Sequence, residues 1–269
     1  MTILIDDTTA TAFLTAPVRE GWFEGDPPIE VRADLRAADV TEDDVALLPL
    51  PEATLLTRTH VIDRSVAIVH DGVGMVAMWT PARPDEIEGP VVCLRDVGAS
   101  GEALVRALLK PFFGIEATKI APRDDPPADA QVIITEGAEA LAPSESGFRE
   151  DLARSWFIMT GKPFVSHVTV IGVRALARDG DEQLAALKKA VETGWERRRD
   201  VRRMIREQSG IESEPLAEVT NRMRFLMEPD DQEPARMLAE RGTWGTDYGR
   251  TLPAYRDQLR RVESEGETA

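Results

Sequence analysis

Short apolar runs alternate with helical patterns through the first half of the chain. The apolar runs predict strands at residues 2–5, 29–35, 45–50, 90–94, 116–120 and 131–135, and the intervening patterns predict helices at 9–20, 51–60 and 100–113. This alternation is typical of an α/β protein with a largely parallel sheet. Residues 66–79 hold two apolar runs split by Asp71-Gly72, which predicts either a hairpin or a bend between two strands.

The second half has one further strand pattern between helices. A helix is predicted at 148–160, a glycine stop at Gly161, and a buried strand at 164–173 that is entered through Pro163. Helical patterns follow at 181–208, 215–227 and 232–240, and the tail 262–269 is polar. Pro81 to Pro84 reads as a hinge, after which a new unit begins.

The junction around Gly161 carries a short motif, in which Trp156, Thr160, Gly161, Pro163 and Phe164 are spaced as W-x3-T-G-x-P-F. The chain thereby resembles the menaquinone-biosynthesis family of the futalosine route that contains chorismate dehydratase. This resemblance implies a two-lobed α/β fold like that of type 2 periplasmic binding proteins. Two mixed, mostly parallel sheets flanked by helices would enclose a ligand cleft. We expect lobe 1 at 1–82 and 168–269, and lobe 2 at 83–167.

Charge and composition limit the partners. A formal charge of −16 opposes binding to nucleic acid or to an anionic membrane, whereas a small carboxylate-bearing ligand needs only a few local donors. No apolar run approaches the roughly 20 residues of a membrane helix. The N-terminus has no basic region before its apolar residues, so we expect a cytoplasmic protein. We expect it to be a monomer or a homodimer. The lone Cys93 lies in an apolar run and is expected in the core, with a catalytic thiol as the minor alternative.

Known cofactor motifs are missing from the sequence. It has no G-x-G-x-x-G, no P-loop, no nucleophile elbow and no Cys-x-x-Cys, and its three histidines, His60, His70 and His167, have no metal-ligand spacing. We therefore expect neither a cofactor nor a metal.

The turn Gly98-Ala99-Ser100-Gly101 stands between a predicted strand and a predicted helix. Small residues there would let a ligand approach the free N–H groups of the first helical turn, although Ser100 could equally cap the helix. The resemblance favours the ligand, because the family presents a turn of this kind to its substrate and Ser100 falls on the family's threonine. All four residues are expected to bind substrate.

Polar residues near the return strand form a second candidate group. Thr160, Ser166 and His167 need partners if they are buried, and ligand in the cleft is one source. His167 is either a general acid or base or an ordinary structural histidine. Thr135 and Glu136 end a strand of lobe 2, where ligands of α/β sheets usually bind. We expect Thr135 to contact ligand and Glu136 to be a solvated loop residue.

The resemblance places two further segments at the cleft. His70 and Asp71 lie near its mouth, where the family's serine falls on Met75, and Thr9 takes the place of the family's asparagine. The implied function is elimination of water from chorismate to give 3-enolpyruvoyl-benzoate, with His167 and His70 catalytic. The alternative is a non-catalytic binding protein or sensor for a small carboxylate, because Thr9 and Met75 replace the family's residues.

One charge run invites a different interpretation. Residues 195–203 contain five arginines, yet they lie within a helical pattern flanked by acidic residues. We expect a solvated helix face with internal ion pairs and no nucleic-acid site.

Overall fold

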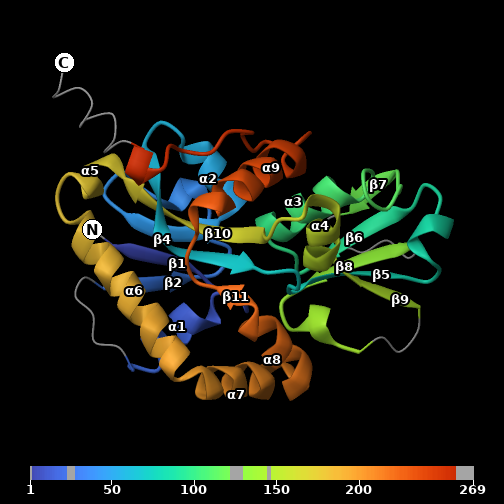
Figure 1. Ribbon diagram of the computed structural model, residues 1–269, viewed down its shortest axis with the longest axis horizontal. Coiled ribbons are helices and arrows are strands. Elements are labelled where there is room, and N and C mark those ends of the chain that lie inside the picture. The colour runs from blue at the N-terminus through green and yellow to red at the C-terminus, as the bar shows by residue number, and fades with distance from the viewer. Residues whose placement is uncertain (1, 23–27, 122–129, 144–146, 259–269) are drawn as a thin grey trace.

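The chain folds around two β-sheets, each with its own helices (Figure 1). The computed structural model describes residues 2–22, 28–121, 130–143 and 147–258; the predicted tail 262–269 lies outside them. We call each sheet, with the helices that pack on it, a lobe. The α/β architecture with two mixed sheets agrees with the sequence prediction.

The first sheet has the strand order β11-β4-β10-β3-β1-β2. Its strands are β1 (Ile3–Asp6), β2 (Ile29–Arg32), β3 (Val45–Pro49), β4 (His60–His70), β10 (Phe164–Gly172) and β11 (Met223–Arg224). β1 is parallel to β2 and β3, while β10 runs antiparallel to β3 and β4. Every residue of β3 and of β10 is buried, as expected for strands that helices cover on both faces.

The second sheet has the order β7-β6-β8-β5-β9. Its strands are β5 (Val76–Thr80), β6 (Val91–Arg95), β7 (Lys119–Ala121), β8 (Val132–Glu136) and β9 (Phe148–Asp151). β6 is parallel to β7 and β8, and β5 is antiparallel to β8 and β9. Cys93 is fully buried in β6, which is consistent with a core residue.

Two connections join the sheets. β4 ends at His70 in the first sheet and β5 begins at Val76 in the second, so the Asp71-Gly72 segment is the bend and not the hairpin. The return connection runs from helix α4 (Leu152–Thr160) through Gly161 into β10. The chain enters the second sheet at Val76 and returns to the first sheet at Phe164. The lobe boundaries expected from the sequence, at 82/83 and 167/168, stay a prediction.

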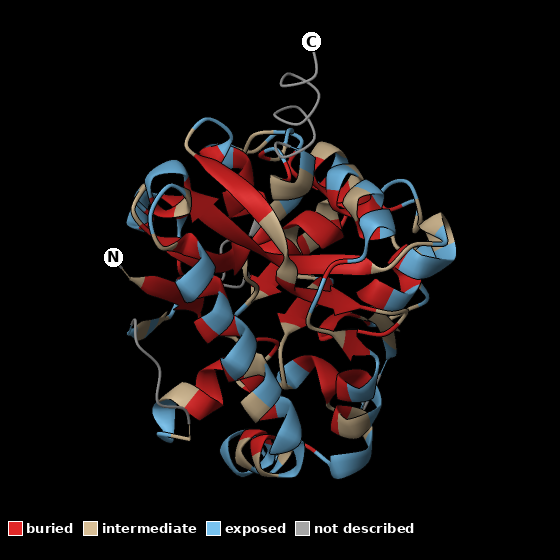
Figure 2. Cartoon of the chain, turned by 60° about the vertical axis from the view of Figure 1, so that its left-hand side comes forward, coloured by how far each residue is buried: buried red, intermediate tan, exposed pale blue. Residues whose placement is uncertain are grey.

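Helices cover both sheets. They are α1 (Ala12–Arg19), α2 (Leu50–Ala53), α3 (Ala99–Leu108), α4 (Leu152–Thr160), α5 (Val173–Leu176), α6 (Gly180–Glu196), α7 (Arg198–Ser209), α8 (Ser213–Asn221) and α9 (Gln232–Gly242). Short 3₁₀ turns occupy Ala37–Asp39, Thr54–Leu56, Pro84–Glu86, Glu139–Leu141 and Pro229–Asp231. Figure 2 shows buried strands enclosed by helices whose outer faces are exposed.

Several predicted helices differ in extent. The helix expected to run through His60 stops early, because His60 already pairs with Gly172 as the first residue of β4. The helix expected from Phe148 begins as strand β9, and Asp151 then caps α4 by accepting a hydrogen bond from the Arg154 N–H. The pattern 181–208 is broken at Arg197 into α6 and α7. In each case tertiary pairing or packing overrides the local pattern.

α9 belongs to the first lobe in sequence but packs against α3 of the second (Figure 1). Gly242 permits this close approach, because a Cβ there would lie 2.3 Å from the Ala103 carbonyl oxygen. Within the described residues, no helix is long and apolar enough to cross a membrane.

Candidate functional site

A small cavity lies where strand ends of the two sheets face each other. The first lobe lines it with residues 6–9 at the end of β1, residues 34–36 and Pro49. The second lobe contributes Asp96, Gly98 and Ala99 after β6, and Glu136 and Gly137 at the end of β8. The carboxyl ends of strands are the usual ligand position in open α/β sheets, so this cavity is the candidate site.

The cavity volume is about 160 Å³. A water molecule occupies roughly 30 Å³ in the liquid, so the space holds about five waters. It is smaller than the roughly 300–1,000 Å³ pockets of drug-sized ligands. A ligand larger than this would require the lobes to separate for entry, as hinged binding proteins do.

Four buried side chains form one hydrogen-bond relay beside the cavity. His167 Nε2 lies 3.2 Å from Asp6 Oδ2, and Nδ1 lies 3.0 Å from Ser166 Oγ. His70 Nε2 lies 3.1 Å from the same Ser166 oxygen. Because a carboxylate accepts, His167 Nε2–H donates to Asp6, and Ser166 Oγ bridges the two imidazoles. The relay therefore runs from His70 to the cavity wall at Asp6.

His70 is the buried end of this relay. Its ring stacks on Phe164 with centroids 5.3 Å apart, and burial lowers its pKa to about 3, with a smaller contribution from His167. His70 is therefore neutral at pH 7. Its Nδ1 has no hydrogen-bond partner among the described residues.

Glu136 faces the cavity from the opposite lobe. Its Oε2 accepts a hydrogen bond of 2.8 Å from the Gly98 N–H. Burial raises the pKa of the carboxyl group, and the Gly98 hydrogen bond opposes this shift. Gly101 makes room for it, since a Cβ there would lie 2.5 Å from Oε2. The expectation of a solvated loop residue was therefore wrong, because Glu136 sits at the N-terminus of α3, where a carboxylate is stabilised.

Ser100 does not line the cavity. It is buried between the lobes, where its Oγ accepts from the Leu50 N–H at 3.2 Å and donates to the Ser166 carbonyl. Thr9 does line the cavity, and it touches the other lobe at Gly137, where a Cβ would lie 2.7 Å from Thr9 Oγ1. Gly137 has a φ of +71°, a conformation that favours glycine.

Three other predicted site residues have partners outside the cavity. Asp71 forms an ion pair with Arg224, whose Nε lies 2.7 Å from Asp71 Oδ2. Thr135 accepts a hydrogen bond from the Trp79 indole at 2.9 Å. Thr160 donates to the Trp156 carbonyl at 2.7 Å within α4. A role of these residues in ligand binding stays a prediction.

The charges around the cavity are mostly negative. Five acidic residues line it, namely Asp6, Asp7, Asp34, Asp96 and Glu136. The basic residue of the lining is Arg36, whose Nη1 lies 3.1 Å from Glu52 Oε1 and donates to the Tyr248 hydroxyl at 3.2 Å. A ligand carboxylate would therefore need Arg36 to exchange Glu52 for the ligand.

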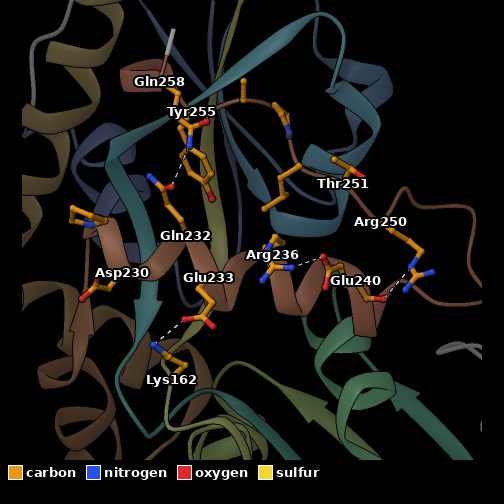
Figure 3. A pocket seen from close by; sticks show the side chains of 14 residues that line it. Lys162, Asp230, Gln232, Glu233, Arg236, Glu240, Arg250, Thr251, Tyr255 and Gln258 are labelled. Carbon is orange, nitrogen blue, oxygen red and sulfur yellow. Dashed lines mark hydrogen bonds and ion pairs between the residues drawn. The ribbon is translucent and has the colours of Figure 1, made fainter. Parts of the chain in front are cut away.

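A larger cavity of about 560 Å³ lies elsewhere, between α9 and the segment 250–258 (Figure 3). Its charged side chains pair with one another: Lys162 Nζ lies 3.0 Å from Glu233, and Arg236 Nη1 lies 2.7 Å from Glu240. The Tyr255 hydroxyl is buried and has no partner among the described residues. Because it is remote from the strand ends and its charges are balanced, we centre the functional site on the interlobe cavity.

The two lobes and the cavity between them have the fold of periplasmic binding proteins. Solved structures of similar fold include protein AF1704 from Archaeoglobus fulgidus, 14% identical, covering 89% of this chain and 95% of that one with a TM-score of 0.59. The periplasmic aliphatic sulphonate binding protein SsuA from Escherichia coli is 11% identical, with coverage of 88% and 89% and a TM-score of 0.55. The ligand-binding component of an ABC-type import system from Staphylococcus aureus, solved with zinc bound, is 11% identical, with coverage of 96% and 94% and a TM-score of 0.61.

At the sequence level, residues 34–243 match the family described as menaquinone biosynthesis. The chain belongs to this family, as the W-x3-T-G-x-P-F motif predicted. A search among curated proteins finds no match.

Proposed function

We propose that the chain is a hydro-lyase of menaquinone biosynthesis that acts by acid–base chemistry in the interlobe cavity. The observation that carries this proposal is the pair of carboxyl groups, Asp6 and Glu136, which line one cavity from opposite lobes in different environments. Such pairs divide the roles of acid and base in many active sites. Membership of the menaquinone-biosynthesis family supports the pathway.

The reaction implied by the family resemblance is conversion of chorismate into 3-enolpyruvoyl-benzoate. One carbon–hydrogen bond and one carbon–hydroxyl bond break, water leaves, and the ring becomes aromatic without any oxidant or reductant. In our proposal Asp6 removes the proton from carbon and Glu136 donates a proton to the departing hydroxyl. The raised pKa of Glu136 supports its role as the acid, because it retains a proton at higher pH than an ordinary glutamate.

His167 positions the base in this scheme. It donates to Asp6 Oδ2, while the Leu35 N–H donates to Asp6 Oδ1 at 2.9 Å. These two donors fix the carboxylate against the cavity. His167 and His70, which the sequence predicts to be catalytic, would then act through Asp6 as members of the relay.

The acidic lining favours a second candidate function, which is non-catalytic binding. Glu136 accepts a hydrogen bond from the Gly98 N–H, a donor that a ligand carboxylate would otherwise use, and Arg36 pairs with Glu52. A neutral or cationic ligand needs no such exchange. This sensor or binding role keeps the same cavity but requires no proton transfer.

The experiment that separates the two candidates is incubation of the purified protein with chorismate, followed by chromatography and mass detection. The hydro-lyase proposal expects 3-enolpyruvoyl-benzoate to form and Asp6→Asn to abolish its formation. Binding without product, seen as a thermal shift that Asp6→Asn alters, would favour the second candidate. A cytoplasmic location belongs to the proposal and is tested by cell fractionation.

A further inference from the structure

α7 is a basic helix on an acidic protein. Residues 197–206 contain six arginines and one aspartate, a net charge of +5 in a chain whose formal charge is −16. The helix lies at one end of the first lobe, next to α8 (Figure 1). Its outward residues include Arg198, Arg199, Arg203 and Arg206, all exposed.

Few of these charges are neutralised within the chain. Arg203 pairs with Asp200 at 2.9 Å and with Glu207 at 3.8 Å, as the sequence predicts for internal ion pairs. Among the described residues no carboxylate pairs with the other five arginines of the run. Arg202 donates instead to the Thr220 hydroxyl and the Asn221 side chain.

Two of the arginines lie over exposed or partly exposed aromatic rings. The Arg197 guanidinium is 4.9 Å from the Trp22 ring centroid, and that of Arg198 is 5.6 Å from the Trp195 centroid. Trp195 is itself 37% exposed. Arginine and tryptophan are among the residues enriched at the centres of protein interfaces, so the patch has the composition of a contact surface.

α8, which packs against α7, carries the opposite charge. Glu212, Glu214 and Glu218 are exposed, and none forms an ion pair with a described residue. Gly210, at a φ of +72°, ends α7 and turns the chain toward α8. A basic helix and an acidic helix thus lie next to each other in one helical hairpin. α7 has guanidinium groups without a carboxylate partner, and α8 has carboxylates without a basic partner, among the described residues.

We propose that this hairpin is the interface between two copies of the chain. In a two-fold dimer the α7 arginines of one copy face the α8 glutamates of the other, and every pairing is made twice. A nucleic acid or an anionic membrane fits less well, because the remainder of the chain is strongly negative and α8 would lie against phosphates. The interface is independent of the function proposed for the cavity.

The test is sedimentation velocity of the full chain with two charge-reversed variants. The first is Arg199→Glu with Arg206→Glu, and the second is Glu214→Arg with Glu218→Arg. We expect the wild type to dimerise at low salt, with an affinity that falls on the order of tenfold or more when salt is raised to about 0.5 M. Each variant alone is expected to be monomeric, whereas an equimolar mixture should form a heterodimer.

Arg58→Glu with Arg83→Glu is the matched control for the first variant, because it makes the same change of charge at exposed sites away from the hairpin. It should dimerise as the wild type does, and circular dichroism should confirm that every variant is folded. A wild type that stays monomeric at low salt would overturn the proposal. So would a dimer that both hairpin variants leave intact, or a mixture that fails to associate.

Discussion

At the residue scale, the buried polar side chains of the return strand, Ser166 and His167, are hydrogen-bonded to His70 and Asp6. Ser166 and His167 stand out as polar residues in an apolar run, which predicts a need for buried partners. The partners, Asp6 and His70, come from residues about a hundred or more positions away. Asp6 and Glu136 share one signal that sequence analysis could have used, because each closes a strand at the ligand-binding edge of a sheet.

Glu136→Gln tests the proposed acid. The amide keeps the size of the side chain but has no acidic proton to donate, so turnover of chorismate is expected to fall by about 10²–10⁴-fold. Glu139→Gln is the control, since Glu139 is outside the cavity lining and pairs with Arg95 on the surface. Equal rates for Glu136→Gln and the wild type would remove Glu136 from the mechanism.

His70→Phe tests the buried end of the relay through pH. The pKa of His70 is lowered to about 3 by burial, against about 6.5 in an unfolded chain. The unfolded state therefore takes up a proton first, and the wild type loses stability as pH falls through 6.5 toward 3. Between pH 7 and pH 5 this loss is about 2 kcal/mol, and it is absent in the variant.

Urea denaturation at the two pH values measures the difference. At pH 7 the variant is expected to be less stable than the wild type by about 1 kcal/mol, because Ser166 loses its hydrogen bond with His70. At pH 5 the variant should be as stable as the wild type or more stable than it. A difference in free energy of unfolding that does not change with pH would contradict the assigned burial of the imidazole.

At the element scale, the sequence pattern located the strands better than the helix ends. Gly161 was correctly predicted to end a helix, and it does so with a φ of +67° while its N–H bonds the Phe157 carbonyl at 2.8 Å. The predicted helix start at Phe148 was wrong, because pairing with Thr80 makes Phe148 part of β9. Strand pairing across distant segments leaves no local periodicity that a single sequence could reveal.

Glycine substitutions separate conformational strain from steric overlap. A Cβ at Gly161 would meet no atom within 4 Å, so Gly161→Ala should cost only about 1–2 kcal/mol for the left-handed backbone. Gly210 has a φ of +72° and equally open space, so Gly210→Ala should lower the stability by a similar amount. At Gly194 a Cβ would lie 1.8 Å from the Phe13 carbonyl oxygen, and Gly194→Ala should cost about 3 kcal/mol or more.

Thermal and urea denaturation of the three variants check this order. If Gly194→Ala proves as mild as Gly161→Ala, the close packing of α6 on α1 is wrong.

At the scale of the whole molecule, the lobes are held together by buried groups as well as by the two connections. Ser100 gives the clearest case, since its hydroxyl joins α3 of the second lobe to Leu50 and Ser166 of the first. The sequence could not distinguish this role from a ligand site, because a serine at a helix N-terminus suits both. The position of the second lobe relative to the first determines whether Ser100 faces a ligand or the other lobe, and no local sequence pattern encodes that position.

Ser100→Ala is expected to destabilise the protein by about 1–3 kcal/mol, because the Leu50 N–H and the Ser166 carbonyl lose a buried partner. Small-angle scattering should also show a larger radius of gyration as the lobes part. Ser155→Ala is the matched control: Ser155 is as buried, but its hydroxyl bonds Asp151 within one lobe. The prediction fails if the two variants show the same scattering profile and the same stability.

The central claim is that Asp6 and Glu136 form an acid–base pair in the interlobe cavity, and a single assay of chorismate turnover tests it most directly. The wild type, Asp6→Asn and Glu136→Gln are each incubated with chorismate, and 3-enolpyruvoyl-benzoate is quantified by chromatography and mass. The account predicts product from the wild type and a loss of at least about 10²-fold in both variants. No product from the folded wild type, or undiminished product from either variant, would contradict it.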